Sequence, residues 1–70
     1  MKVKVIIMPR EGLLDPEARA IRELLKQSGL EVYSLRVGKI VELDLRDPSE
    51  ARLIAEKFLV NPLVEEFLIE

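Results

Sequence analysis

The chain has 70 residues, which is enough for one small domain over residues 1–70 and too few for two. It contains no Cys, which excludes disulfides, and no His, which argues against a structural zinc site. Hydrophobic residues make up 49% of the sequence, mostly Leu, Ile and Val. A core this small usually needs a further source of stability. With disulfides and zinc set aside, we expect that source to be another subunit.

The charge balance and the hydropathy pattern exclude two further classes of partner. The 11 basic and 13 acidic residues give a net charge of −2, whereas nucleic-acid binding normally needs a basic surface that neutralises phosphates. The longest apolar run, residues 5–8, is far shorter than the roughly 20 residues of a membrane span. The N-terminus, where lysines alternate with valines, is unlike a signal peptide. We therefore expect a cytoplasmic protein with no nucleic-acid partner and no membrane partner.

The residue types also limit the chemistry that the chain can carry out. Without His or Cys, the Ser–His and Cys–His nucleophile pairs cannot be built. The three glycines lie too far apart for a nucleotide-binding fingerprint. The carboxylate pairs Glu65/Glu66 and Asp44/Asp47 could support acid–base chemistry, although ordinary surface charges explain them better. We expect no catalytic, cofactor-binding or metal-binding residues.

The first half of the chain predicts a strand and then a helix. Apolar residues alternate along residues 2–8, which is typical of a strand. Asp15 and Pro16 suit the N-cap and the first position of a helix, and Gly29 suits the position after its end. The apolar spacing between them predicts a helix over residues 16–28.

A pair of strands, residues 32–37 and 39–46, is predicted on either side of Gly38. A two-residue loop would place Leu35 beside Glu42 and would split the apolar faces. An odd-length turn, or a bulge at Gly38, places Leu35 opposite Val41 and keeps the faces together. We expect the odd-length turn.

The last part of the chain predicts a second helix and a final strand. Asp47 and Pro48 start the helix, with Glu50 three residues after the cap. Asn61 and Pro62 end it, and residues 63–70 supply the strand. The resulting order, β-α-β-β-α-β, predicts an α+β, ferredoxin-like fold. Such a fold is an antiparallel four-stranded sheet with two helices on one face.

One face of such a sheet stays uncovered. Its expected apolar residues are Ile6, Met8, Ile40, Val64 and Leu68, and its expected charged residues are Lys4, Arg36, Glu42, Asp44 and Glu66. An apolar patch of this kind usually marks a partner surface, whereas scattered surface aliphatics need no partner.

Three segments resemble the PurS family, the small subunit of phosphoribosylformylglycinamidine synthase. Gly12-Leu13-Leu14-Asp15-Pro16 is similar to the family's start of the first helix, and Asn61-Pro62-Leu63-Val64-Glu65 is similar to its last strand. Arg36-Val37-Gly38-Lys39, followed by Ile40-Val41-Glu42-Leu43, is similar to its hairpin. The chain departs from the family at Glu17-Ala18, where Gln-Gly is frequent, and in a shorter second helix.

The resemblance implies a non-catalytic auxiliary subunit in purine biosynthesis, within a ligase that converts formylglycinamide ribonucleotide to the amidine. ATP, Mg and glutamine would be used by the partner subunits, and this chain would bind no cofactor. Its partners would be a large synthetase subunit, a glutaminase subunit and itself, as a homodimer or a dimer of dimers. It would bridge the two other subunits and support ammonia transfer. The expected subunit-interface residues are Ile6, Met8, Arg36, Gly38, Lys39, Ile40, Val64 and Leu68.

The residues alone leave a second function open. Ferredoxin-like domains often form dimers that bind metabolites between their subunits, and one fold hosts many functions. A dimeric regulatory module that binds a small molecule is therefore the alternative.

Overall fold

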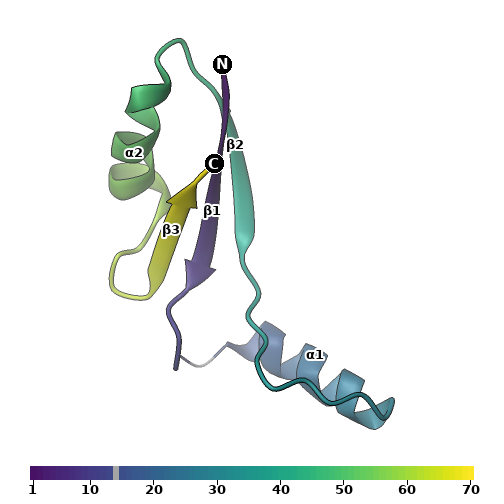
Figure 1. Ribbon diagram of the computed structural model, residues 1–70. Helices are drawn as coiled ribbons and strands as arrows, with labels where there is room; N and C mark the ends of the chain where they lie inside the picture. The colour runs from purple at the N-terminus through teal and green to yellow at the C-terminus, as the bar shows by residue number, and fades with distance from the viewer. Residues whose placement is uncertain (14) are drawn as a thin grey trace.

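The computed structural model describes residues 1–13 and 15–70, and shows an α+β fold (Figure 1). Leu14, in the first segment that resembles the PurS family, lies outside the described residues. The elements in chain order are β1 (Lys2–Pro9), α1 (Pro16–Gln27), β2 (Lys39–Asp44), a 3₁₀ turn η1 (Pro48–Glu50), α2 (Ala51–Ile54), a π-helical turn η2 (Ala55–Leu59) and β3 (Glu65–Ile69). These elements match the predicted ones closely, except for residues 32–37.

The sheet has three strands in the order β2-β1-β3, and both pairings are antiparallel. β1 is the central strand, so that Val5 lies opposite Val41 on one side and Ile69 on the other. The end of β1 is extended by the Arg10 N–H, which donates to the Val64 carbonyl at 2.9 Å.

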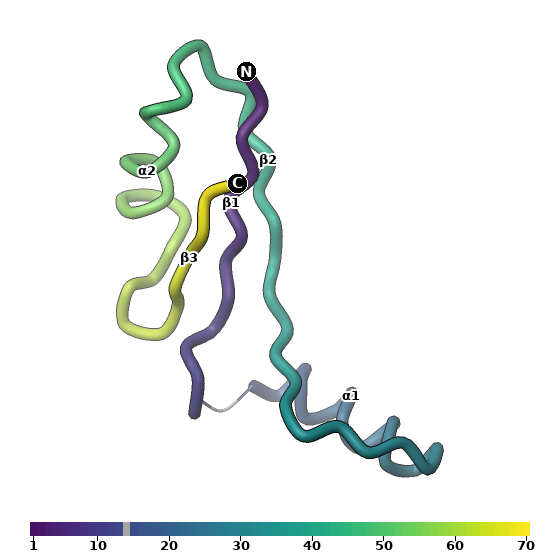
Figure 2. The backbone as a smooth tube through the Cα atoms, viewed as in Figure 1, coloured from purple at the N-terminus to yellow at the C-terminus, as the bar shows by residue number. Residues whose placement is uncertain are grey.

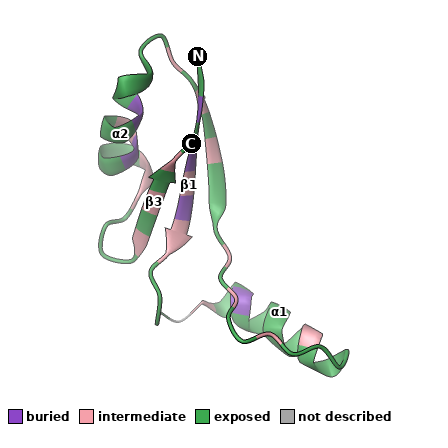
Figure 3. Cartoon of the chain, viewed as in Figure 1, coloured by how far each residue is buried: buried purple, intermediate pink, exposed green. Residues whose placement is uncertain are grey.

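The core lies between the sheet and α2 with its following turn. Val5, Ile7 and Ala55 form its buried centre, and partly buried apolar residues pack around them: Val41, Leu43, Leu59, Val60 and Phe67 (Figure 3). Small side chains at Ala51 and Ala55 let the helix approach the sheet closely. The alternation along β1 that predicted the strand thus also places its buried face.

The helix caps form as their sequences predict. The Asp15 side chain accepts hydrogen bonds from the backbone N–H groups of Glu17 and Ala18, both at 3.1 Å. At the other end of α1, Gly29 has φ +80°, a left-handed conformation that favours glycine. The Asp47 side chain accepts in the same way from the Ser49 N–H at 3.0 Å.

The prediction of a strand over residues 32–37 and a hairpin at Gly38 is wrong for this structure. The chain instead runs back along α1 after residue 30, bends at Tyr33 and then continues into β2 without a hairpin turn (Figure 2). Residues 32–37 pair with no strand in the described part of the molecule. As a result, α1 extends beyond the end of the sheet (Figure 1). The sheet has three strands rather than four, and α2, not both helices, covers its face.

The core position of Ile7 can be tested against a matched isoleucine outside the core. Ile7 is 1% exposed and Ile40 is 61% exposed. Ile7→Ala leaves a cavity and should lower the free energy of unfolding by about 2–5 kcal/mol, whereas Ile40→Ala should change it by less than about 0.5 kcal/mol. Equilibrium urea unfolding measures both, and equal losses would contradict the placement of the core.

Candidate functional site

The sheet face opposite α2 carries a row of isoleucine and leucine side chains that crosses all three strands. Ile6 lies opposite Ile40 of β2 and opposite Leu68 of β3. Ile40 is 61% and Leu68 63% exposed, while Ile6, in the central strand, is half-buried. We call this surface the open face. The register confirms that Ile6, Ile40 and Leu68 lie side by side, as the alternation predicts.

Charged side chains border the row on the open face. Lys4 lies opposite Glu42, and its backbone N–H donates to the Glu70 carbonyl at 3.0 Å. The Lys2 ammonium is 3.5 Å from the same Glu42 carboxylate. An apolar row bordered by charges of both signs has the composition of a protein–protein interface with a polar rim.

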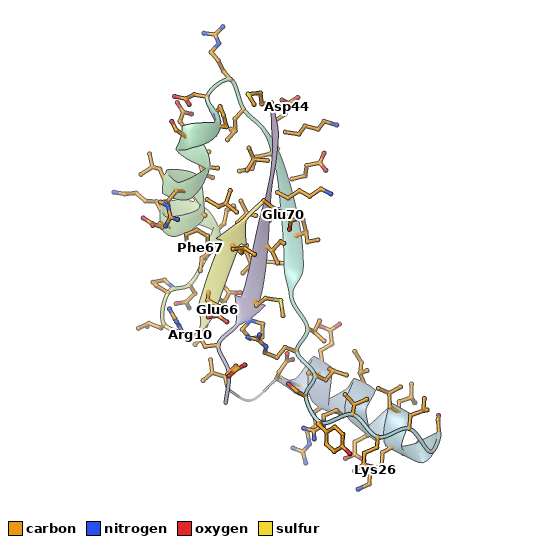
Figure 4. The ribbon with its side chains drawn as sticks, in the orientation of Figure 1. Arg10, Lys26, Asp44, Glu66, Phe67 and Glu70 are labelled. Carbon is orange, nitrogen blue, oxygen red and sulfur yellow. The ribbon has the colours of Figure 1, made fainter. Side chains whose placement is uncertain are left out.

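Arg36 links the chain before β2 to the far side of the sheet. Its guanidinium donates to the Glu66 carboxylate at 2.9 Å and to the Pro9 carbonyl at 3.1 Å, and lies 4.0 Å from the Glu11 carboxylate. Figure 4 places Glu66 on β3, at the end of the sheet nearest α1. A second arginine, Arg10, donates twice to the Pro62 carbonyl, at 2.9 and 3.1 Å. Sequence reasoning missed the Arg10 contact, because nothing local signals a bond to a carbonyl 52 residues away.

Gly38 is needed for close approach, not for a turn. Its φ is not positive, so the expected turn conformation is absent. A Cβ at this position would collide with the Met8 sulfur and with the Ile7 carbonyl oxygen. The backbone of residue 38 therefore lies directly against β1.

The other expected interface residues divide between two faces. Met8 lies on β1 beside Gly38, and Val64, 41% exposed, precedes β3. Lys39 lies opposite Ile7, and therefore projects toward the α2 side rather than the open face. The structure thus brings Ile6, Met8, Ile40, Leu68 and Arg36 together, and leaves Lys39 apart.

The carboxylates considered for catalysis each have a structural partner. Asp44 pairs with the N-terminal amino group at 3.2 Å, and Glu66 pairs with Arg36. Glu65 accepts from the Asn61 N–H at 2.9 Å, and Asp47 caps the second helix. Over residues 1–13 and 15–70, no three acidic side chains lie close enough together to hold a metal ion. None of the helices in that part of the chain has the length and apolar character to cross a membrane.

The comparisons with known proteins agree over nearly the whole chain. A family model for PurS, phosphoribosylformylglycinamidine (FGAM) synthase, matches residues 2–70. The chain belongs to the PurS family. It is 31% identical to the PurS subunit of Bacillus subtilis over 75 residues, which cover 99% of this chain and 89% of that protein. Membership makes it a subunit of FGAM synthase, a ligase of purine biosynthesis.

Solved structures of the family match the fold as well as the sequence. A Bacillus subtilis PurS structure aligns with a TM-score of 0.83 and 33% identity, and covers 99% of this chain and 94% of that one. A chain in the PurLQS structure from Thermotoga maritima aligns with a TM-score of 0.81 and 29% identity, over 99% and 93% of the two chains. This likeness supports the ferredoxin-like class with the three-stranded sheet described above.

The cap at Asp47 predicts a measurable pH dependence. Hydrogen bonds from the Ser49 hydroxyl, at 2.7 Å, and from the Ser49 N–H lower the pKa of this carboxyl. A lowered pKa means that the cap stabilises the fold above the ordinary aspartate pKa, and that this contribution disappears as the pH falls through the folded-state value. Ser49→Ala should move the Asp47 pKa back toward its ordinary range in an NMR titration. An unchanged midpoint would contradict the bond from the Ser49 hydroxyl to Asp47.

The close approach at Gly38 predicts an unusual sensitivity to one methyl group. Gly38→Ala forces the Met8 side chain or the β1 backbone to move, which should lower the free energy of unfolding by about 1–3 kcal/mol. Ser34→Ala, at an exposed position of the same extended segment, is the control and should stay within about 0.5 kcal/mol of wild type. Thermal unfolding measures both, and a neutral Gly38→Ala would show that β1 and residue 38 are not in contact.

Proposed function

We propose that this chain is a non-catalytic subunit that bridges the glutaminase and synthetase subunits of FGAM synthase and supports ammonia transfer between them. The similarity to a chain in PurLQS from Thermotoga maritima supports association with two further subunits. ATP, Mg and glutamine would then be used by those subunits, while this chain would supply binding surface.

The open face is the observation that supports this proposal. The row of Ile6, Ile40 and Leu68 crosses a sheet whose other face is occupied by α2, and two of its three side chains are more than half exposed. Burial of exposed aliphatic surface is the main favourable term in protein association. The four carboxylates considered for catalysis are engaged in hydrogen bonds and ion pairs, so the exposed surface is what the site offers.

Self-association is the second part of the proposal. α1 is only partly covered by its own chain: Ile21 and Leu24 on the helix are 38% and 66% exposed, and Leu30, just after its end, is 57% exposed. A helix with this much apolar surface in water is stabilised when a second chain covers it. A homodimer would place two copies of the open face on one bridging unit, one for each larger subunit.

Charge substitutions in the row test the bridging function. Ile6→Glu or Leu68→Glu would bury an unpaired carboxylate against a partner, and should reduce reconstituted glutamine-dependent FGAM synthase activity about tenfold or more. Leu53→Glu introduces the same charge at a half-exposed position of α2, and should leave reconstitution unchanged.

The measurement combines the purified chain with its organism's own synthetase and glutaminase subunits. Circular dichroism of each variant first verifies that it folds. If both row variants reconstitute as efficiently as wild type, the open face is not the bridging surface. If the wild-type chain binds neither subunit, the bridging function itself is wrong.

A further inference from the structure

A groove lies between α1 and the chain that returns along it. Its volume is about 790 Å³, which falls within the range of small-molecule sites in proteins. α1 contributes the buried Ala18 to its walls, and the returning chain contributes Leu30, Val32 and Leu35. Every residue that lines the groove comes before β2 and outside β1 and β3, so the groove is separate from the open face.

Three cationic side chains of α1 line this groove: Arg19, Arg22 and Lys26. The turn of an α-helix places them within about 60° of one another and spreads them over about 10 Å of its axis. Figure 4 shows Lys26 near the end of α1 that lies away from the sheet. Like charges four residues apart, such as Arg22 and Lys26, repel each other. Over residues 1–13 and 15–70, none of the three takes part in an ion pair. An anion in the groove would relieve this repulsion.

The groove also contains hydrogen-bond acceptors. The carboxylates of Asp15, Glu23 and Glu31 line it, and Asp15 is already bonded to the backbone at the start of α1. The other two carboxylates would repel a ligand that is anionic throughout, but they can accept hydrogen bonds from hydroxyl or amino groups. This mixture favours a ligand that combines phosphate groups with hydrogen-bond donors over inorganic phosphate or a uniformly acidic peptide.

An aromatic side chain completes the lining of the groove. Tyr33 lines it and is 87% exposed. An exposed aromatic ring is a platform on which a nucleobase can stack. Cations for phosphates, carboxylates for sugar hydroxyls and an aromatic ring for a base are the groups that proteins use to recognise a nucleotide.

We propose that this groove binds a nucleotide with two or more phosphates. The phosphates would contact the three cations of α1, because a single phosphate cannot reach side chains spread over about 10 Å. The sugar hydroxyls would donate to Glu23 or Glu31, and the base would stack on Tyr33.

The nucleotide site is compatible with self-association through α1, and it does not depend on the bridging function. Ile21 and Leu24, the exposed apolar residues of α1, lie at least about 100° around the helix from the three cations. A second copy that covers these two residues therefore leaves the cations free. Since nucleotide binding is measured on the purified chain alone, its failure would leave the bridging function standing, and a failure of reconstitution would leave the nucleotide site standing.

Isothermal titration calorimetry with ATP, in magnesium-free buffer at low salt, tests the phosphate contacts. The wild-type chain should bind ATP saturably, and Arg22→Ala should weaken the binding about tenfold, because it removes a charge-assisted contact. Arg46→Ala is the matched control: it makes the same change of net charge at an exposed position after β2, outside the groove. Its affinity should stay within about twofold of wild type.

The contact with the base is tested at Tyr33. Tyr33→Ala should weaken ATP binding about tenfold, because it removes the stacking surface, whereas Tyr33→Phe keeps the ring and should bind as wild type. Inorganic tripolyphosphate, which has no base, should bind about tenfold more weakly than ATP. Circular dichroism first verifies that each variant folds, which these exposed positions favour.

Four results would overturn the nucleotide site. The first is no saturable binding of ATP at millimolar concentrations. The second is tripolyphosphate binding as tight as that of ATP, together with no effect of Tyr33→Ala, which would show an anion-binding patch only. The third is an equal loss in Arg22→Ala and Arg46→Ala, which would show general charge attraction. The fourth is displacement of ATP by a polyglutamate peptide more readily than by tripolyphosphate, which would show that the groove receives an acidic protein segment.

Discussion

The position of residues 36–38 against the end of β1 is the constraint on which the rest of the arrangement depends. The Arg36 guanidinium donates to the Glu66 carboxylate and to the Pro9 carbonyl, and the backbone at Gly38 lies against Ile7 and Met8. Because the chain approaches from there, it enters β2 without a hairpin turn, and α1 lies beyond the end of the sheet (Figure 1). The elongated shape follows from this path, and so does the outer edge of β2, which no strand covers within the described residues.

The two faces of the three-stranded sheet have different roles. On one face, Val5 and Ile7 pack against Ala55 and are removed from water. On the other face, the row through Ile6 stays exposed and is bordered by paired charges. A single alternation along β1 produces both surfaces, which explains how so short a chain can have a core and still offer an apolar surface to partners.

Local signals in the sequence predicted the elements well. The helices begin after Asp15 and Asp47, and α1 ends before Gly29, because of interactions that act within a few residues. The alternation along β1 depends only on the strand period. The open-face residues Ile6, Ile40 and Leu68 followed from the same period. Membership of the PurS family agreed with the resemblance of the short segments.

The hairpin at Gly38 could not be predicted correctly from the same signals. Side-chain parity specifies which face of a neighbouring strand residues 33, 35 and 37 would share, but it does not specify whether such a strand pairs with them. The choice depends on long-range contacts such as Arg36 with Glu66, 30 residues apart in sequence. Gly38 was likewise identified as important for the wrong reason, since its lack of a side chain serves the contact with β1.

Hydrogen exchange at the amides of residues 32–37, followed as the protein is diluted, tests this account most directly. The path described above predicts that, in the dilute chain, these amides exchange faster than those of β2, because residues 32–37 pair with no strand in the described part of the molecule. Protection as strong as that of β2 at every dilution would mean that each chain closes its own hairpin, and would contradict the account.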